Sequence, residues 1–415
     1  PLETLRDDPL RLLRGIRFAS TFGFDLDDGF AEAAALPEIV AALASKVSRE
    51  RIGIELRKVF ASRDPARGFA LLEAYGVRDV VFAPHSGAAE AQTVGATTTH
   101  WPSDSVAFDG AGPWARAVEH ARRLSALRQK GGAKDADADV AEANVEADAD
   151  QGADSNGVLT PGYALEVMSA ALSYAQPAAP ATVRALAELE RAVAEARSLD
   201  VARSGRRFPA AVESLATSYE GIAEGVLLRN LCFSRREPRA VARILALAAA
   251  LRLALRSDAS NGTKPRELLD AWRADLESNS LLAGLWFRAA ETASRNVDVG
   301  ANDGEGLWRC AARVAATSPE CWGDSESEGE SESDLAQMVD TLFAPAARAA
   351  AARAPLLNGH DAVRLLGGGG ADVKCALNMV AAWQMTQPHD ATKEAAERWL
   401  AGEVEDLVGP RTTTK

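Results

Sequence analysis

Asp8 and Arg11 lie one helical turn apart at the start of a predicted helix, and together they could read the edge of a flat polar ligand. A carboxylate accepts hydrogen bonds, and a guanidinium donates them in a planar fork. The pair is complementary to an edge with an amino group beside a ring acceptor, which cytosine and adenine have and uracil and guanine lack. On spacing alone, a surface helix with a capping aspartate and solvated arginines is the simpler interpretation.

The helix that carries this pair is predicted to have Asp8 as its N-cap and Pro9 at its first position. Arg11, Arg14 and Arg17 repeat every three residues and should rise along one flank. Arg14 and Arg17 could reach a phosphate or the 3′ end of a substrate, or they could brace the helix. The predicted buried stripe comprises Leu10, Leu13 and Ile16.

Residues 7–18, Asp-Asp-Pro-Leu-Arg-Leu-Leu-Arg-Gly-Ile-Arg-Phe, and the later motif 48–52, Ser-Arg-Glu-Arg-Ile, resemble the neck of class II tRNA nucleotidyltransferases. These are the CCA-adding enzymes and their bacterial poly(A) polymerase relatives. The resemblance implies that Asp8 and Arg11 pair with the base of the incoming CTP or ATP. The resemblance also implies that four residues of the second motif brace the neck helices: Ser48, Glu50, Arg51 and Ile52.

The far end of the chain is similar to the tail of eukaryotic CCA-adding enzymes. It contains Pro-Leu-Leu-Asn-Gly-His-Asp at 355–361, a glycine-rich run at 367–370, Trp-Gln at 383–384 and a final charged helix at 392–400. The match is looser than that of the neck, but the segments occur in the family's order. It favours CCA addition over poly(A) synthesis.

The catalytic segments of this family, Gly-Gly-x-Val-Arg-Asp and a metal-binding Asp-x-Asp, are not found in a folded context in this sequence. Asp135-Ala136-Asp137 matches the second by letter but lies in a low-complexity acidic run. We therefore expect this chain to comprise the neck, body and tail without the catalytic head. It should contain no catalytic residue and no metal ligand, and it should be inactive on its own. In the full-length enzyme the resemblance implies Mg²⁺, with CTP and ATP as substrates. Alternatives are a poly(A) polymerase and a headless, non-catalytic tRNA-binding module.

The composition predicts an all-α protein, rich in alanine, leucine and arginine, with few strand signals. The expected domains are a neck at 1–90, a body at 91–330 with an acidic insert at about 132–157, and an acidic linker and tail at 331–415. Residues 86–112 should form a loop. Helices beyond the neck are predicted at 113–130, 161–175, 180–198, 207–216, 220–230, 237–256, 265–277, 281–294, 304–317 and 334–351.

Acidic residues are concentrated in two segments that lack apolar residues to bury and should be disordered. Residues 135–154 hold eight acids and residues 324–334 hold six, and without these fourteen the net charge of −13 would be +1. The rest of the chain can therefore present basic surface to the phosphates of its implied partner, tRNA. The candidate contacts are Arg116, Arg122, Arg123, Arg206, Arg207, Arg235, Arg236 and Lys374.

The four cysteines have no metal-binding spacing and fit a reducing compartment. No apolar run is long enough to cross a membrane. The oligomeric state is not predicted, and mitochondrion, plastid, nucleus and cytoplasm all remain possible locations.

Overall fold

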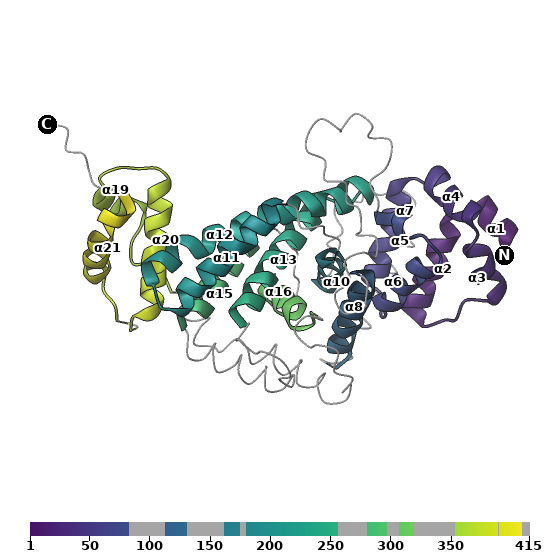
Figure 1. Cartoon of the computed structure of the whole chain (residues 1–415), viewed down its shortest axis with the longest axis horizontal. Helices are drawn as coiled ribbons and strands as arrows, with labels where there is room; N and C mark the ends of the chain where they lie inside the picture. The colour runs from purple at the N-terminus through teal and green to yellow at the C-terminus, as the bar shows by residue number, and fades with distance from the viewer. Residues whose placement is uncertain are drawn as a thin grey trace.

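The computed structural model describes residues 1–82, 113–130, 162–174, 180–255, 280–296, 307–318, 353–388 and 390–408, and their regular secondary structure is all helical. This confirms the predicted all-α class. The predicted loop at 86–112, both acidic segments and the helices predicted at 265–277 and 334–351 lie outside these residues. The molecule is elongated, with the N-terminal helices at one end and the tail helices at the other (Figure 1).

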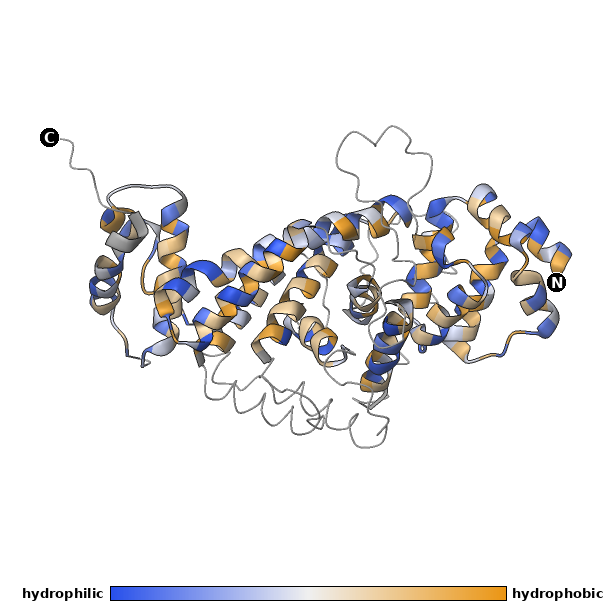
Figure 2. Cartoon of the chain, viewed as in Figure 1, coloured by the Kyte–Doolittle hydropathy of each residue, from blue (hydrophilic) through white to orange (hydrophobic). Residues whose placement is uncertain are grey.

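The N-terminal unit comprises seven helices, of which α2 packs against α5 and α6. Their bounds are α1 (Leu2–Asp7), α2 (Leu10–Phe22), α3 (Asp28–Ala34), α4 (Pro37–Lys46), α5 (Arg49–Phe60), α6 (Pro65–Ala74) and α7 (Arg78–Phe82). The predicted stripe of Leu10, Leu13 and Ile16 is buried, together with Leu12. Apolar residues line the packed sides of the helices and hydrophilic residues line the outer sides (Figure 2).

The start of α2 differs from the prediction, in which Asp8 is the N-cap and Pro9 the first helical residue. Pro9 instead occupies the N-cap, and Leu10 is the first helical residue. Helix α1 ends at Asp7, and Asp8 is its C-cap. Because Asp8 is used in this way, α2 begins one residue later than predicted. Asp8 still caps through its side chain: Oδ1 accepts a hydrogen bond from the N–H of Leu10 at 3.2 Å.

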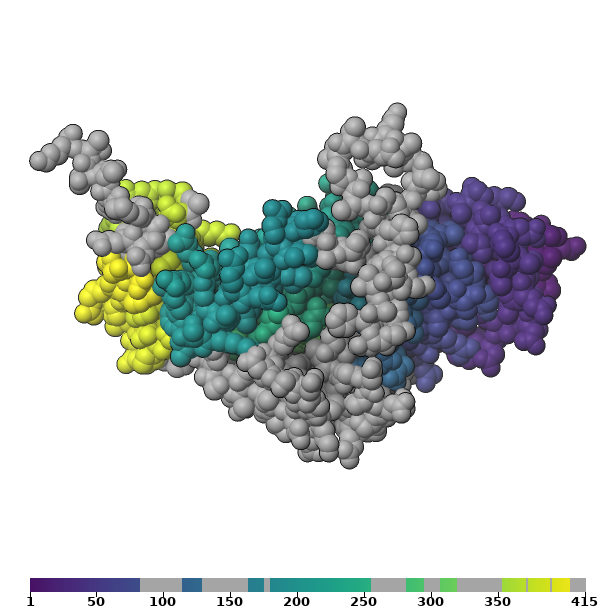
Figure 3. All heavy atoms as spheres, viewed as in Figure 1, coloured from purple at the N-terminus to yellow at the C-terminus, as the bar shows by residue number. Residues whose placement is uncertain are grey.

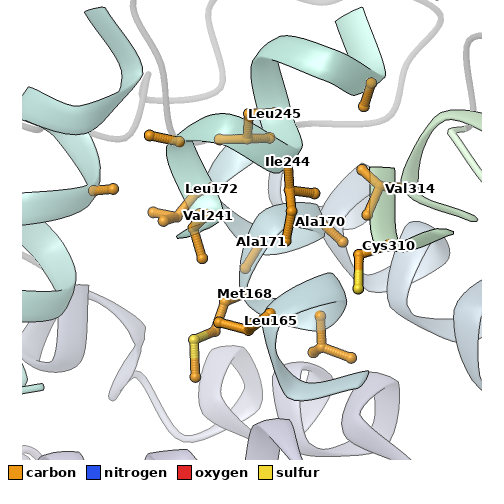
Figure 4. Packing of buried hydrophobic residues seen from close by; sticks show 14 of the residues in the cluster. Leu165, Met168, Ala170, Ala171, Leu172, Val241, Ile244, Leu245, Cys310 and Val314 are labelled. Carbon is orange, nitrogen blue, oxygen red and sulfur yellow. The ribbon is translucent and has the colours of Figure 1, made fainter. Parts of the chain in front are cut away.

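The body comprises α8 (Pro113–Lys130), α10 (Gly162–Ser173), α11 (Pro180–Arg197), α12 (Val201–Ala223), the π-helix η2 (Glu224–Asn230), α13 (Arg236–Leu255), α15 (Ser280–Asn296) and α16 (Leu307–Ala316). Its centre lies between α10, α13 and α16, where alanines alternate with leucine, isoleucine and valine (Figure 4). The small side chains let the helices pack closely. One continuous cluster of buried apolar residues runs from α1 to α16, so the N-terminal unit and the body share a core.

The helices predicted at 207–216 and 220–230 are one continuous element in the structure, formed by α12 and η2. Thr217 lies inside this element, and its hydroxyl donates to the carbonyl of Glu213 one turn earlier at 2.9 Å. Pro209 lies inside α12 and removes one backbone donor there. Packing against α11, α13 and the tail helix α20 outweighs these local preferences.

The tail comprises α19 (Gly359–Leu366), α20 (Ala371–Thr386) and α21 (Lys393–Val408). It has a separate apolar cluster that includes Leu357, Leu366 and Leu400. The other side of α20 packs on the body at Gly205, where a Cβ atom would lie 2.8 Å from the Cβ of Ala382. The tail forms the end of the molecule opposite the N-terminal unit (Figure 3).

The N-terminal unit is attached to the body through α6, which packs on α8, and through α5, which contacts α10 and η2. Gly53 lies so close to η2 that a Cβ atom would be 1.8 Å from the carbonyl oxygen of Leu231. One turn later, the guanidinium of Arg57 pairs with Glu237 at 3.0 Å and lies over the ring of Phe233, 4.3 Å from its centroid. Only glycine allows this approach, so residue 53 determines how closely the two parts can pack.

We predict that Gly53→Ala lowers the free energy of unfolding by about 1–3 kcal/mol, because the new methyl group meets backbone rather than a movable side chain. Gly221→Ala is the matched control: this glycine also lies inside a helix, and its Cβ would meet nothing within 4 Å. The control should be neutral or stabilising by up to about 1 kcal/mol. Urea unfolding of both variants tests this, and equal effects would contradict the close packing at Leu231.

Candidate functional site

Asp8 lies in the turn between α1 and α2, and its two carboxylate oxygens have different partners. Oδ1 accepts from the backbone N–H of Leu10, and Oδ2 accepts from Nη2 of Arg51 at 3.2 Å. The second contact joins positions 43 residues apart. Each carboxylate oxygen can accept a second hydrogen bond, so Asp8 is held in one orientation and keeps acceptor capacity toward a ligand.

Arg11 is exposed on the first turn of α2, close in sequence and space to Asp8. Its Nη1 donates to the backbone carbonyl of Thr4 at 3.2 Å, which ties the guanidinium to α1. A guanidinium has five N–H groups, and this contact uses one of them. The structure therefore places a carboxylate and a guanidinium at the same turn, each anchored on one side. The contact with Thr4 could not be predicted from the sequence, because every residue type has a backbone carbonyl that can accept a hydrogen bond.

Arg14 and Arg17 have different environments although both were predicted on the same flank. Arg14 is exposed. Arg17 is 5% exposed and its Nε lies 2.9 Å from Oε2 of Glu55 on α5, with its guanidinium over the ring of Phe18. The charge of Arg17 is thus buried against Glu55, which favours the bracing role that the sequence left open for it.

The motif at 48–52 begins α5 and contacts the candidate site through one residue. Ser48 is the N-cap, and its hydroxyl accepts from the N–H of Arg51 at 3.5 Å. Ile52 is fully buried and Glu50 is exposed. Arg51 contacts the carboxylate of Asp8, so this motif is joined to the turn before α2.

Three candidate RNA contacts lie on α8. Arg122 and Arg123 both donate to the carboxylate of Glu119, at 2.8 Å and 2.6 Å. Burial would raise the pKa of Glu119, but the hydrogen bonds and charges of the two arginines lower it. Glu119 therefore stays ionised and offsets part of the positive charge. Arg116 is half-buried on the same helix.

The remaining candidates lie at the two ends of the body. Arg235 lies in the turn that leads into α13 and Arg236 is the first residue of that helix, and both are exposed. Arg206 is exposed on α12, and Lys374 is exposed on α20, which crosses α12. Arg207, also exposed on α12, pairs with Glu195. The candidates thus lie at intervals along the molecule and do not form a single cluster.

Metal-binding groupings are absent from the part of the chain that the structure describes: no three histidine, cysteine or acidic side chains gather there as ligands. Among the same residues, Cys232, Cys310 and Cys375 form no disulfide. No described helix combines the length and apolar character that crossing a membrane requires.

Residues 32–88 match a family described as a probable RNA and SrmB- binding site of polymerase A. The N-terminal region is also similar to curated proteins. It is 42% identical over 83 residues to a mitochondrial CCA tRNA nucleotidyltransferase of Candida glabrata, and 39% identical over 84 residues to that of Saccharomyces cerevisiae. A tRNA nucleotidyltransferase of Schizosaccharomyces pombe is 42% identical over 72 residues.

These matches cover 17–20% of this chain and 15–16% of the relatives. The chain thus spans about one sixth of the length of the curated relatives it matches. The family match runs through α4 to α7 and includes the whole motif at 48–52.

We predict that Glu55→Ala lowers the free energy of unfolding by about 3–5 kcal/mol, because it leaves the charge of Arg17 buried without its carboxylate. Glu38→Ala is the control: Glu38 pairs with Arg6 on the surface, where both side chains are about half exposed. That change should cost less than about 1 kcal/mol. Thermal or urea unfolding measures both, and similar losses for the two variants would contradict a bracing role for Arg17.

Proposed function

We propose, from the similarity of its N-terminal region to CCA tRNA nucleotidyltransferases, that this chain is the base-selecting and tRNA-binding part of such an enzyme. In this function CTP and ATP are the substrates and the 3′ end of tRNA is the acceptor. In this proposal the chain selects the base and binds the RNA.

The observation that carries this proposal is the geometry at the start of α2. Asp8 is held by Arg51 and by the N–H of Leu10, and Arg11 is held by the carbonyl of Thr4. An acceptor and a planar donor are thus fixed at one turn before any ligand arrives. Preorganised groups of this kind favour the complementary base, because a mismatched base leaves a desolvated donor or acceptor unpaired.

In the proposed reading, Asp8 accepts from the exocyclic amino group of cytosine or adenine. Arg11 donates to the adjacent ring nitrogen and, in cytosine, to the neighbouring carbonyl oxygen. Uracil and guanine present a ring N–H beside a carbonyl there, so a donor would face Arg11 and an acceptor would face Asp8. Arg14, exposed one turn further, is available to a phosphate.

RNA binding is proposed to follow shape and phosphate rather than sequence. The matched family's description names an RNA-binding site, which supports a role for the N-terminal unit in holding RNA. The body and tail add Arg116, Arg122, Arg123, Arg235, Arg236 and Lys374 as candidate phosphate contacts. Their spread along an elongated molecule suits a helical RNA arm, which displays phosphates along its length.

Nucleotidyl transfer in this family implies Mg²⁺, which activates the attacking hydroxyl and stabilises the leaving pyrophosphate. The described residues do not offer a fitting set of ligands, and no residue of this part of the chain is assigned to the metal. We therefore propose that the described part of the chain alone does not transfer nucleotides.

We predict that Asp8→Ala in the full-length protein loses discrimination against UTP and GTP while the fold is retained. Loss of one hydrogen-bonding partner at a desolvated site should reduce the selectivity ratio about 10- to 100-fold. Arg11→Ala should behave alike. Single-turnover incorporation of all four nucleotides into tRNA that lacks its 3′ end measures the ratio.

Asp7→Ala is the matched control, since this exposed neighbour makes no described side-chain contact with Asp8, Arg11 or Arg51. It should keep wild-type selectivity. If Asp8→Ala also kept it, the base-reading role would be wrong. Sequencing the products separates CCA addition from poly(A) synthesis, and a full-length protein that binds tRNA without extending it would indicate a non-catalytic binding module.

A further inference from the structure

An exposed strip of two arginines and three phenylalanines runs along α2 and the turn after it. Arg11, Arg14, Phe18 and Phe22 lie within a sector of about 80°, because successive helical residues turn by about 100°. Phe24 follows directly after the helix. We call these five residues the α2 strip. Its phenylalanines are 38%, 52% and 61% exposed, whereas the leucines of the same helix are buried.

The three phenyl rings of the α2 strip form a stacked column. The ring centroids of Phe18 and Phe22 are 5.9 Å apart and those of Phe22 and Phe24 are 5.4 Å apart, with nearly parallel planes. The guanidinium of Arg17 closes the inner end, 4.4 Å from the centroid of Phe18. Single exposed apolar residues are ordinary, but three in contact form a patch that indicates a partner.

The charge beside the column indicates which partner fits. Among the described residues, Arg14 has no hydrogen-bond or ion-pair partner, and Arg11 donates only to a neutral carbonyl. The strip therefore combines uncompensated guanidinium groups with flat apolar rings. Single-stranded nucleic acid has the complementary chemistry, because its phosphates pair with arginine and its bases stack on aromatic rings.

The position of the α2 strip also follows from the proposed function, on which this inference rests. The incoming base is read at Asp8 and Arg11, so the RNA 3′ end that receives it must lie next to them. From residue 11 to residue 22 the helix rises about 16 Å, at about 1.5 Å per residue. Stacked nucleotides advance by about 3.4 Å each, so a three-nucleotide single strand fits along the strip.

We propose that the α2 strip holds the single-stranded 3′ end of the RNA substrate. Arg14 pairs with a phosphate of this strand, and the column of Phe18, Phe22 and Phe24 continues the stack of its bases. A protein segment with carboxylates over the arginines and aliphatic side chains over the rings is the competing occupant.

The test measures binding of the full chain to two fluorescent RNA hairpins that share one stem, by fluorescence anisotropy. One hairpin ends in a three-nucleotide 3′ overhang and the other is blunt. We expect the wild type to prefer the overhang hairpin. The double variant Phe22→Ala/Phe24→Ala should lose about tenfold in affinity for that hairpin and bind the blunt one unchanged. Arg14→Ala should reduce the slope of log affinity against log salt concentration by about one, as expected for the loss of one phosphate contact.

The matched control is Val183→Ala/Leu199→Ala, which removes two apolar side chains that are similarly exposed in the body. It should bind both hairpins like the wild type. Equal binding of the two hairpins by the wild type, no loss in the phenylalanine variant, or an equal loss for both hairpins would each overturn the proposal.

Radical footprinting of the full-length protein tests the competing occupant. We expect the three phenylalanines to be oxidised in the free protein and protected when the overhang hairpin is added. Protection already present in the free protein would mean that protein covers the strip, and the proposal would be wrong. None of these outcomes alters the nucleotide selectivity of Asp8→Ala, so the inference and the proposed function can fail separately.

Discussion

The buried ion pair between Arg17 and Glu55 fixes α2 against α5, and the candidate site depends on how these two helices are placed. The two charged groups lie 2.9 Å apart in the core, and sliding one helix on the other would leave each charge buried without its counter-charge. A second contact, between Asp8 and Arg51, joins the same two helices nearer their starts. Because these two contacts lie at different points along the length of α5, together they determine both the position and the tilt of α2.

Helix α5 also connects the candidate site to the rest of the molecule. Arg51 and Glu55 contact the α2 side, while Gly53 and Arg57 contact η2 and the turn before α13. One helix of twelve residues thus carries the contacts to both parts. Helix α5 therefore contacts both the turn that carries Asp8 and the turn that leads into α13.

Local features of this chain could be predicted from sequence, and long-range pairings could not. The stripe of Leu10, Leu13 and Ile16 follows from helical periodicity alone, and it is buried as predicted. The predicted break between 216 and 220 was wrong, because packing against α11, α13 and α20 keeps α12 helical. The partner of Asp8 lies 43 residues away, and no period or residue type links the two positions. The domain boundaries and the individual RNA contacts remain predictions.

The different roles of the α2 arginines follow from helical phase. A three-residue step turns by about 300°, which is about 60° short of a full turn, so each successive arginine moves about 60° around the helix. Arg11 and Arg14 remain on the exposed side, but the second step carries Arg17 into the core, where it needs Glu55. Phe18, four residues after Arg14, returns to the exposed side. The same repeat therefore places two arginines on the exposed surface and one in the core, where it pairs with Glu55.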